Sequence, residues 1–159
     1  MKVAIDATSL LMPSAGVRNY VHYWLSSLQE AARQGRDATV VTYSAMVHEC
    51  LAAAEELVVE GYEVEVVDLR SIKPLDTDTV LASVARTGRL LAVGEAWPWG
   101  GVTAEILARV ASEGFGLLDV PPRRLNAKNT PVPFHPNLWG THRPTAQTVA
   151  RAMRELLRL

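Results

Sequence analysis

The chain contains 159 residues, of which 48% are hydrophobic and 21% are charged, and its net charge is −1. These values are typical of one soluble globular domain with a single core, and they exclude the strongly basic surface of a nucleic-acid-binding protein. The single cysteine, Cys50, excludes an internal disulfide framework and a zinc site built from several cysteines, so we expect a cytoplasmic protein. There is no run of about 18 apolar residues, so we expect no membrane span, and a start with Asp6 in its first apolar stretch does not resemble a signal peptide.

The first 34 residues predict one strand, one loop and one helix. Val3–Ala7 is a short apolar run typical of a buried strand, and a loop with Pro13, Ser14 and Gly16 follows it. Val17–Gln34 predicts an amphipathic helix. Its apolar residues recur at intervals of three and four: Val17, Tyr20, Val21, Trp24, Leu25 and Leu28. We expect this stripe to pack into the core, because it needs a partner surface.

The rest of the chain alternates strand and helix patterns. Strands are predicted at Thr39–Tyr43, Val64–Leu69, Arg89–Gly94 and Arg123–Asn126. Helices are predicted at Met46–Glu60, Asp76–Gly88, Thr103–Ser112 and Thr145–Arg158. Between the last strand and the last helix, the proline-rich segment Thr130–Pro144 should form an irregular arm. Five strands and five helices in alternation predict an α/β fold in one domain, residues 1–159, as a three-layer α/β/α sandwich around a mostly parallel five-stranded sheet.

Five segments from residue 35 onward resemble the transketolase C-terminal domain in the β subunit of thiamine-diphosphate-dependent 2-oxo acid dehydrogenases. They are GRDATVVTYSAMVHECLAAAEEL, VEVVDLRSIKPLD, TVLASVARTGRLLAVGEA, GGVTAEILARV and LDVPPRRLNAKNTPVPFHPNL. The resemblance implies subunit association and docking of the acyltransferase's peripheral binding domain. It also implies that the cofactor is held elsewhere, since the diphosphate and its metal bind a Gly-Asp-Gly motif of another domain, and this motif is absent here.

The chain departs from that family at three places. Ser44 stands where the family usually has glycine, and Trp97-Pro98-Trp99 replaces a loop that is usually polar or contains arginine. Trp139 stands where the family usually has an acidic residue.

The first 34 residues resemble a different family. MKVAIDATSLL and SAGVRNYVHYWLSSL are similar to the opening strand, glycine loop and first helix of a GT-B glycosyltransferase of the group 4 type. The two resemblances meet near Gln34–Arg36, which predicts a chimera of two partial units, either engineered or recombined, with a native gene fusion as the alternative. In the glycosyltransferase family the sugar-nucleotide site lies mostly in a second domain, which has no counterpart here.

Glycines before predicted helices are the candidate anion sites. Gly16 precedes the first helix, and Gly100 with Gly101 precedes the helix at Thr103–Ser112, where backbone N–H groups can bind an anion. The favoured alternative at each place is a tight turn or close packing of a loop, since one glycine falls short of the G-x-G-x-x-G pattern.

No catalytic, cofactor-binding or metal-binding residue is expected. The four histidines, His22, His48, His135 and His142, lack the spacing of a metal site. Other candidate groups have structural explanations: Asp68 and Glu95 end strands and should cap loops, Ser44 lacks the G-x-S-x-G pattern of a nucleophile, and Cys50 should pack on a helix face.

The candidate interface residues are Trp97, Trp99, Arg123 and His135. Two indoles in one loop after a strand favour a surface for self-association or for a partner. The alternative is that both rings fold back onto the prolines at Pro131–Pro136. The sequence therefore predicts a non-catalytic interaction domain. The alternatives are a fragment that needs a partner chain to complete a thiamine diphosphate site, and a sugar-nucleotide-binding fragment.

Overall fold

The computed structural model describes residues 35–159, so the predicted strand Val3–Ala7, the loop with Gly16 and the helix Val17–Gln34 lie outside the described residues. The strands are β1 (Ala38–Thr42), β2 (Val64–Asp68), β3 (Leu90–Val93) and β4 (Arg123–Leu125). The helices are α2 (Met46–Val59), α3 (Thr77–Thr87), α4 (Val102–Glu113), α5 (Trp139–His142) and α6 (Ala146–Leu157), with single 3₁₀ turns η2 (Phe115–Leu117) and η3 (Pro136–Leu138).

The strands form one parallel sheet in the order β2-β1-β3-β4. Its register places Val40 opposite Val66 and Leu91. The described part of the sheet has four strands, each at a predicted position, rather than the five expected for the whole chain. The fifth predicted strand is Val3–Ala7, which the structure does not describe.

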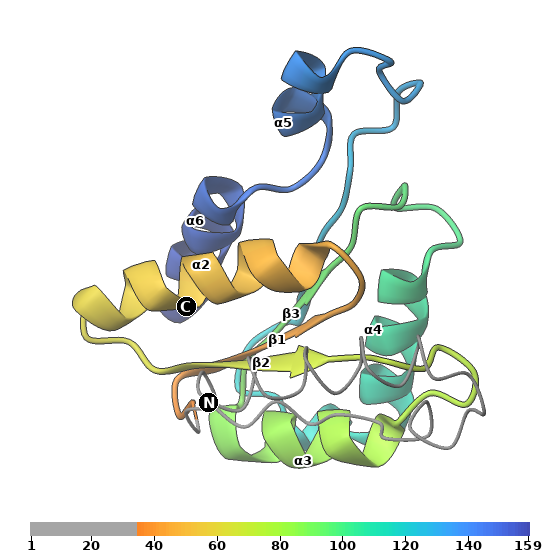
Figure 1. The fold of residues 1–159 in the computed structure, drawn as a ribbon. Coiled ribbons are helices and arrows are strands. Elements are labelled where there is room, and N and C mark those ends of the chain that lie inside the picture. The colour runs from red at the N-terminus through yellow and green to blue at the C-terminus, as the bar shows by residue number, and fades with distance from the viewer. Residues whose placement is uncertain (1–34) are drawn as a thin grey trace, which may run out of the picture.

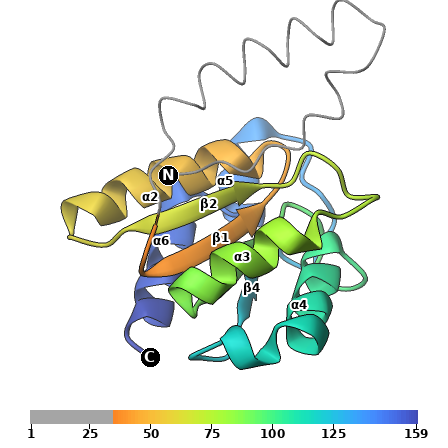
Figure 2. The same cartoon turned by 90° about the horizontal axis from the view of Figure 1, so that it is seen from below.

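Helices cover both faces of the sheet, as Figures 1 and 2 show. On one face α2 and α6 pack together, and their buried residues join a core that includes Val66, Leu91 and Met153. On the other face α3 and α4 enclose a second core, with Val67 and Ile106 among its members. Strands β1 and β2 are buried along their whole length, and three of the five residues in each are apolar, as is typical of parallel strands covered on both faces. The predicted α/β/α sandwich is therefore confirmed.

The helix ends follow from short polar signals. Asp76, the first residue of the helix predicted there, caps α3 by accepting a hydrogen bond from the Thr79 N–H at 3.0 Å. Gly88 ends the same helix with a left-handed backbone, φ 64°. Thr145 caps α6 and forms a reciprocal pair with Thr148.

The arm is less irregular than predicted. Within Thr130–Pro144 the chain forms η3 and the single helical turn of α5. Figure 1 shows the arm and α5 projecting from the layered body on the same side as the loop between β3 and α4. Prolines mark the absence of long regular structure, but they do not exclude one helical turn, because proline is tolerated at a helix start. Pro136 begins η3 in this way.

Among the described residues, no helix has both the length and the apolar character that a membrane crossing requires.

Candidate functional site

The carboxyl ends of the four strands meet at one edge of the sheet, where ligands and partners usually bind in α/β proteins. Ser44 follows β1, Arg70 follows β2, Glu95 follows β3 and Asn126 follows β4. The strand order reverses between β1 and β3, which makes the gap above these two strands the expected ligand crevice.

The side chain of Tyr43 crosses that crevice. Its hydroxyl oxygen lies only 2.9 Å from the place where a Cβ on Gly94 would stand. Any side chain at Gly94 would therefore collide with the phenol ring. Burial, and secondarily the carboxylate of Glu95, raise the pKa of Tyr43, so the phenol stays protonated at neutral pH. A tyrosine ring rather than an open phosphate-binding gap lies above the glycine.

An ion pair follows β2. The Nε of Arg70 lies 2.7 Å from the Oδ2 of Asp68, whose side chain is almost completely buried. Burial raises the pKa of Asp68, while Arg70 and then His48 act in the opposite direction. The pair borders an open depression of about 580 Å³ that Ser44 and His48 also line. Asp68 thus holds the loop after β2 through Arg70, which agrees with the structural role predicted for it.

Ser44 has a strained backbone, with φ 58° in the left-handed region. A strand, a strained serine and a helix are also the backbone elements of a hydrolase nucleophile. The flanking residues Tyr43-Ser44-Ala45, however, do not match the G-x-S-x-G pattern of such a nucleophile. The sequence context thus favours a turn residue rather than a nucleophile.

The candidate anion site at Gly100 and Gly101 has a packing explanation. Gly100 adopts φ 63°, which glycine tolerates best. A Cβ on Gly101, the N-cap of α4, would lie 2.8 Å from the carbonyl oxygen of Trp97. These contacts favour the loop-packing alternative, and anion binding at this helix start stays a prediction. Gly16 lies outside the described residues.

The two tryptophans of the β3–α4 loop differ in their surroundings. Trp97 is 49% exposed, and its Nε1 donates a hydrogen bond of 3.2 Å to the carbonyl oxygen of Thr130 on the arm. Trp99 is 76% exposed and has no such bond among the described residues. Between them, the carbonyl oxygen of Pro98 accepts a hydrogen bond of 2.6 Å from Nη1 of Arg124. Trp97 therefore partly folds back onto the arm, whereas Trp99 remains open.

The arm adds further apolar side chains that the sequence prediction missed as interface candidates. Phe134 is 99% exposed, and Trp139 is 45% exposed although its Nε1 donates to the carbonyl oxygen of Pro133 at 3.1 Å. Val132 and Trp139 border one depression of about 360 Å³. The large exposed apolar side chains of the loop and arm are here named the aromatic surface: Trp97, Trp99, Val132, Phe134, Leu138 and Trp139. The signal that could have found the arm residues is the placement of apolar residues between prolines, where they have no helix or strand face to join.

The other two predicted interface residues lie in different places. His135 lies on the arm, where its Nδ1 accepts a hydrogen bond from the N–H of Asn137 at 3.3 Å. Arg123 forms an ion pair with Glu155 of α6 at 3.3 Å, whereas Arg124 reaches the β3–α4 loop. Neighbouring residues of a strand point to opposite faces, so Arg123 is directed away from the aromatic surface.

The base of the arm is joined to the body through Arg143. Its guanidinium lies 3.7 Å from Glu49 of α2 and 3.8 Å from Glu95 after β3. Glu49 also accepts a hydrogen bond of 2.8 Å from the N–H of Ala146, the first residue of α6. These contacts position the arm beside the loop that carries Trp97.

Reactive groups are not assembled in the described residues. Cys50 is buried on α2, and burial raises the pKa of its thiol to about 12, as expected for a packing residue. Within residues 35–159, no group of three His, Cys, Asp or Glu side chains is placed to hold a metal ion.

Comparison with known proteins assigns the fold. The family model described as "Transketolase, C-terminal domain" matches residues 29–149. The chain belongs to the transketolase C-terminal domain family. It is 45% identical over 126 residues to the β subunit of acetoin:2,6-dichlorophenolindophenol oxidoreductase from Cupriavidus necator, covering 79% of this chain and 37% of the relative. It is 46% identical over 120 residues to the pyruvate dehydrogenase E1 component subunit beta-1 of Arabidopsis thaliana, covering 76% and 33%.

A solved structure agrees with this assignment. A chain of a split-gene transketolase, described as an inactive beta4 tetramer, superposes with a TM-score of 0.71 and 26% identity, over 80% of this chain and 41% of that one. The chain therefore spans 33–41% of the length of each protein to which it is compared.

The family match begins at residue 29, six residues before Gly35. The boundary predicted near Gln34–Arg36 therefore does not coincide with the start of the transketolase C-terminal match. None of the relatives compared above is a glycosyltransferase. The chimera has no support from these comparisons and stays a prediction about residues 1–34.

Proposed function

We propose that this chain is a non-catalytic association domain of the kind found in the β subunits of thiamine-diphosphate-dependent 2-oxo acid dehydrogenases. The observation that carries the proposal is the aromatic surface, where six large apolar side chains are exposed on the β3–α4 loop and the arm. A solvated loop does not expose so much apolar area without a partner. Tryptophan is also enriched among the residues that dominate the free energy of protein–protein binding.

The described residues do not fit a thiamine diphosphate site. They offer no cluster of carboxylate and imidazole groups for the metal that accompanies a diphosphate, and the Gly-Asp-Gly motif is absent from the sequence. Tyr43 crosses the crevice at the point of strand reversal.

The names of the relatives support association as the function. Two are β subunits of oxidoreductases or dehydrogenases, and the solved relative is described as a tetramer of β chains. The partners that fit the proposal are a second copy of this chain, neighbouring dehydrogenase subunits, and the binding domain of the acyltransferase.

Sedimentation of the full chain tests the proposal. The wild-type chain should form a concentration-dependent oligomer, and a double variant Trp97→Ser, Trp99→Ser should sediment as a monomer. The matched control is Phe115→Ser, which removes a 75% exposed aromatic ring of η2 that is not part of the loop or the arm. A monomeric wild type, or an oligomer that survives the double change, counts against self-association at this surface.

Two titrations test the alternative functions. Calorimetry with thiamine diphosphate and Mg²⁺ should show no saturable binding to this chain alone, and binding at micromolar levels would favour the cofactor-binding fragment. Titration with nucleotide sugars tests the glycosyltransferase-like hypothesis for residues 1–34 in the same way.

A further inference from the structure

Charge is divided very unevenly along the chain. Residues 120–154 contain six basic side chains and no acidic one, whereas residues 35–119 contain 14 acidic and six basic side chains. The net charge of −1 for the whole chain hides this division. The basic stretch includes β4 and the arm, so it contains four of the six residues of the aromatic surface.

Three of the six basic side chains have carboxylate neighbours within the domain. Arg154 pairs with Glu56 of α2 and with Glu60, the residue that follows this helix. Arg123 pairs with Glu155, as described above. The guanidinium of Arg143 lies between Glu49 and Glu95. These three charges are largely balanced before any partner binds.

The other three, Arg124, Lys128 and Arg151, are exposed, and no carboxylate of the described residues lies within ion-pair distance of them. Arg151 lies on α6, whereas Arg124 and Lys128 lie next to the aromatic surface. Nη1 of Arg124 donates a hydrogen bond to the carbonyl oxygen of Pro98, the residue between Trp97 and Trp99 in the sequence, so its positive charge is held at the β3–α4 loop without being neutralised. Lys128 is fixed at the root of the arm by a backbone hydrogen bond of 2.9 Å to the carbonyl oxygen of His142.

We propose that the aromatic surface binds an acidic polypeptide segment, whose apolar side chains pack on the indoles and whose carboxylates face Arg124 and Lys128. The proposal rests on the proposed function, because it names the chemistry of the partner at the same surface. A planar guanidinium at the loop that carries both indoles suits a carboxylate, which it can bind through two parallel hydrogen bonds. Exposed charges around an apolar centre set the choice of partner and the association rate more than the total affinity.

A polypeptide fits this surface better than a nucleic acid or a membrane. Two exposed cations neutralise too few phosphates for tight binding to nucleic acid, which depends on many such contacts. The excess of acidic side chains in residues 35–119 would repel an extended polyanion. A short acidic segment with apolar anchors avoids this repulsion, since it covers only the loop and the arm.

Fluorescence anisotropy with labelled synthetic peptides of roughly 12 residues tests the partner's chemistry on the full chain. One peptide alternates Glu with Leu, the second alternates Lys with Leu, and the third alternates Glu with Ser. We expect saturable binding of the Glu-Leu peptide and at least about tenfold weaker binding of the other two peptides. The Glu-Leu complex should also weaken when added salt shortens the screening length from about 30 Å to about 8 Å. A single-stranded oligonucleotide of equal charge is the fourth probe and should bind more weakly than the Glu-Leu peptide.

Charge reversal then locates the site. The double variant Arg124→Glu, Lys128→Glu should bind the Glu-Leu peptide at least about tenfold more weakly than wild type. Arg158→Glu is the matched control, an exposed arginine at the far end of α6, and it should bind as wild type does. Lys128→Glu alone supplies a second test if the double variant does not fold, because this side chain makes no described ion pair.

The outcomes separate this inference from the proposed function. Equal binding of the Lys-Leu peptide, tighter binding of the oligonucleotide, absence of peptide binding, or indifference to charge reversal would each overturn the acidic-partner inference. Association that still depends on Trp97 and Trp99 in sedimentation would leave the proposed function standing in all four cases. If instead the wild-type chain does not self-associate but binds the Glu-Leu peptide in a charge-dependent way, self-association is contradicted and the acidic-partner inference stands.

Discussion

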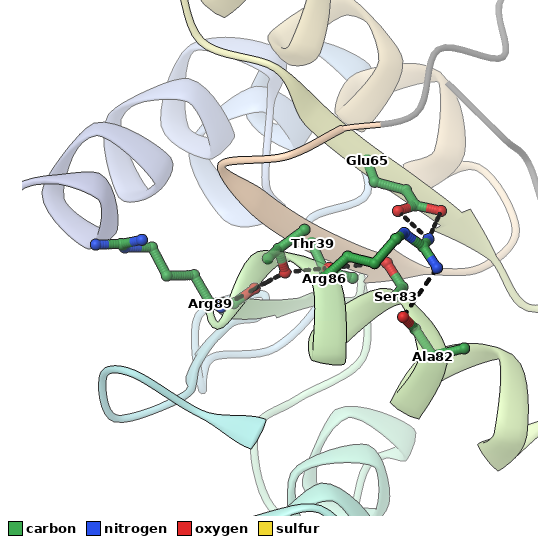
Figure 3. A network of polar contacts seen from close by, with 7 residues as sticks. Thr39, Glu65, Ala82, Ser83, Arg86 and Arg89 are labelled. Carbon is green, nitrogen blue, oxygen red and sulfur yellow. Dashed lines mark hydrogen bonds and ion pairs between the residues drawn. The ribbon is translucent and has the colours of Figure 1, made fainter. Parts of the chain in front are cut away.

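Glu65 accepts two hydrogen bonds, of 2.6 and 2.5 Å, from Nη2 of Arg86, although Glu65 is only 2% exposed and lies on strand β2. Figure 3 shows this pair at the junction of α3 with the sheet, beside the contacts of Thr39 with Ser83. Nη1 of Arg86 also donates to the carbonyl oxygen of Ala82, which holds the guanidinium over the strand. Helix α3 is thus joined to the sheet by polar contacts as well as by its apolar face.

Replacing Arg86 with Ala should destabilise the domain, because it leaves the Glu65 carboxylate buried without its partner. Removing one member of a buried pair costs about 3–5 kcal/mol, and the partial exposure of Arg86 places the expected loss below that range, at about 2–3 kcal/mol. Urea denaturation measures this loss. The double variant Arg86→Met, Glu65→Met should recover much of the stability, and failure to recover would show that the guanidinium acts mainly through Ala82.

Replacing Ser44 with Gly should stabilise the domain. Removing the left-handed strain should raise the free energy of unfolding by about 1–2 kcal/mol. The greater conformational freedom of glycine in the unfolded chain should lower it by about 0.5–1 kcal/mol. The expected net gain is about 0.5–1 kcal/mol in the free energy of unfolding. Ser44→Val is the contrasting change and should lower stability, because a β-branched residue tolerates this backbone poorly. A lower unfolding midpoint for Ser44→Gly would mean that the serine makes a stabilising contact.

Asp68 should make stability depend on pH. Its pKa is raised above the ordinary value of 3.8 in the folded state, so the folded domain binds this proton more tightly than the unfolded chain. The corresponding part of the stability is present at low pH and is lost as pH rises from 3.8 through the raised folded pKa. The variant Asp68→Asn cannot titrate there, so wild type should lose stability relative to it over that interval. The check is the free energy of unfolding of both proteins, measured from about pH 3 to about pH 7. Parallel curves for the two proteins would contradict this account.

Cys50 should resist thiol–disulfide exchange in the folded state. Its side chain is buried and burial raises the pKa of the thiol to about 12, so both access and the thiolate are suppressed. We expect the reaction with a disulfide reagent to be at least about 1000-fold slower in the native chain than in urea. The chain contains one cysteine, so the signal has a single source. Rapid reaction of the native chain would show that α2 opens locally.

The layered fold was predictable because it depends on local sequence. The run Thr39–Thr42 is β-branched throughout and became a buried strand, and Asp76 marked the start of α3 within one residue. The arm was harder to predict, since its prolines hid the single turn of α5. That turn depends on contacts within the arm, such as the hydrogen bond from Trp139 to Pro133.

The candidate surface was only half predictable. Trp97 and Trp99 stood out as two indoles in one loop. The joining of this loop to the arm depends on contacts between distant positions, Trp97 with Thr130 and Arg124 with Pro98, which no local pattern encodes. The sequence could not decide between Arg123 and Arg124 as the residue that faces the loop. In the structure Arg123 pairs with Glu155, whereas Arg124, which points to the opposite face of the strand, reaches the loop.

The uneven charge along the chain joins elements that are far apart in the sequence. Residues 35–119 carry a net charge of −8 from 14 acidic and six basic side chains, and residues 120–154 carry +6. Arg154 of α6 pairs with Glu56 and Glu60, and Arg143 lies between Glu49 and Glu95, so ion pairs connect the C-terminal part of the chain to the body. Because these pairs are partly exposed, their contribution weakens as the Debye length shortens, and the packing of α6 on α2 should become less stable as the salt concentration rises.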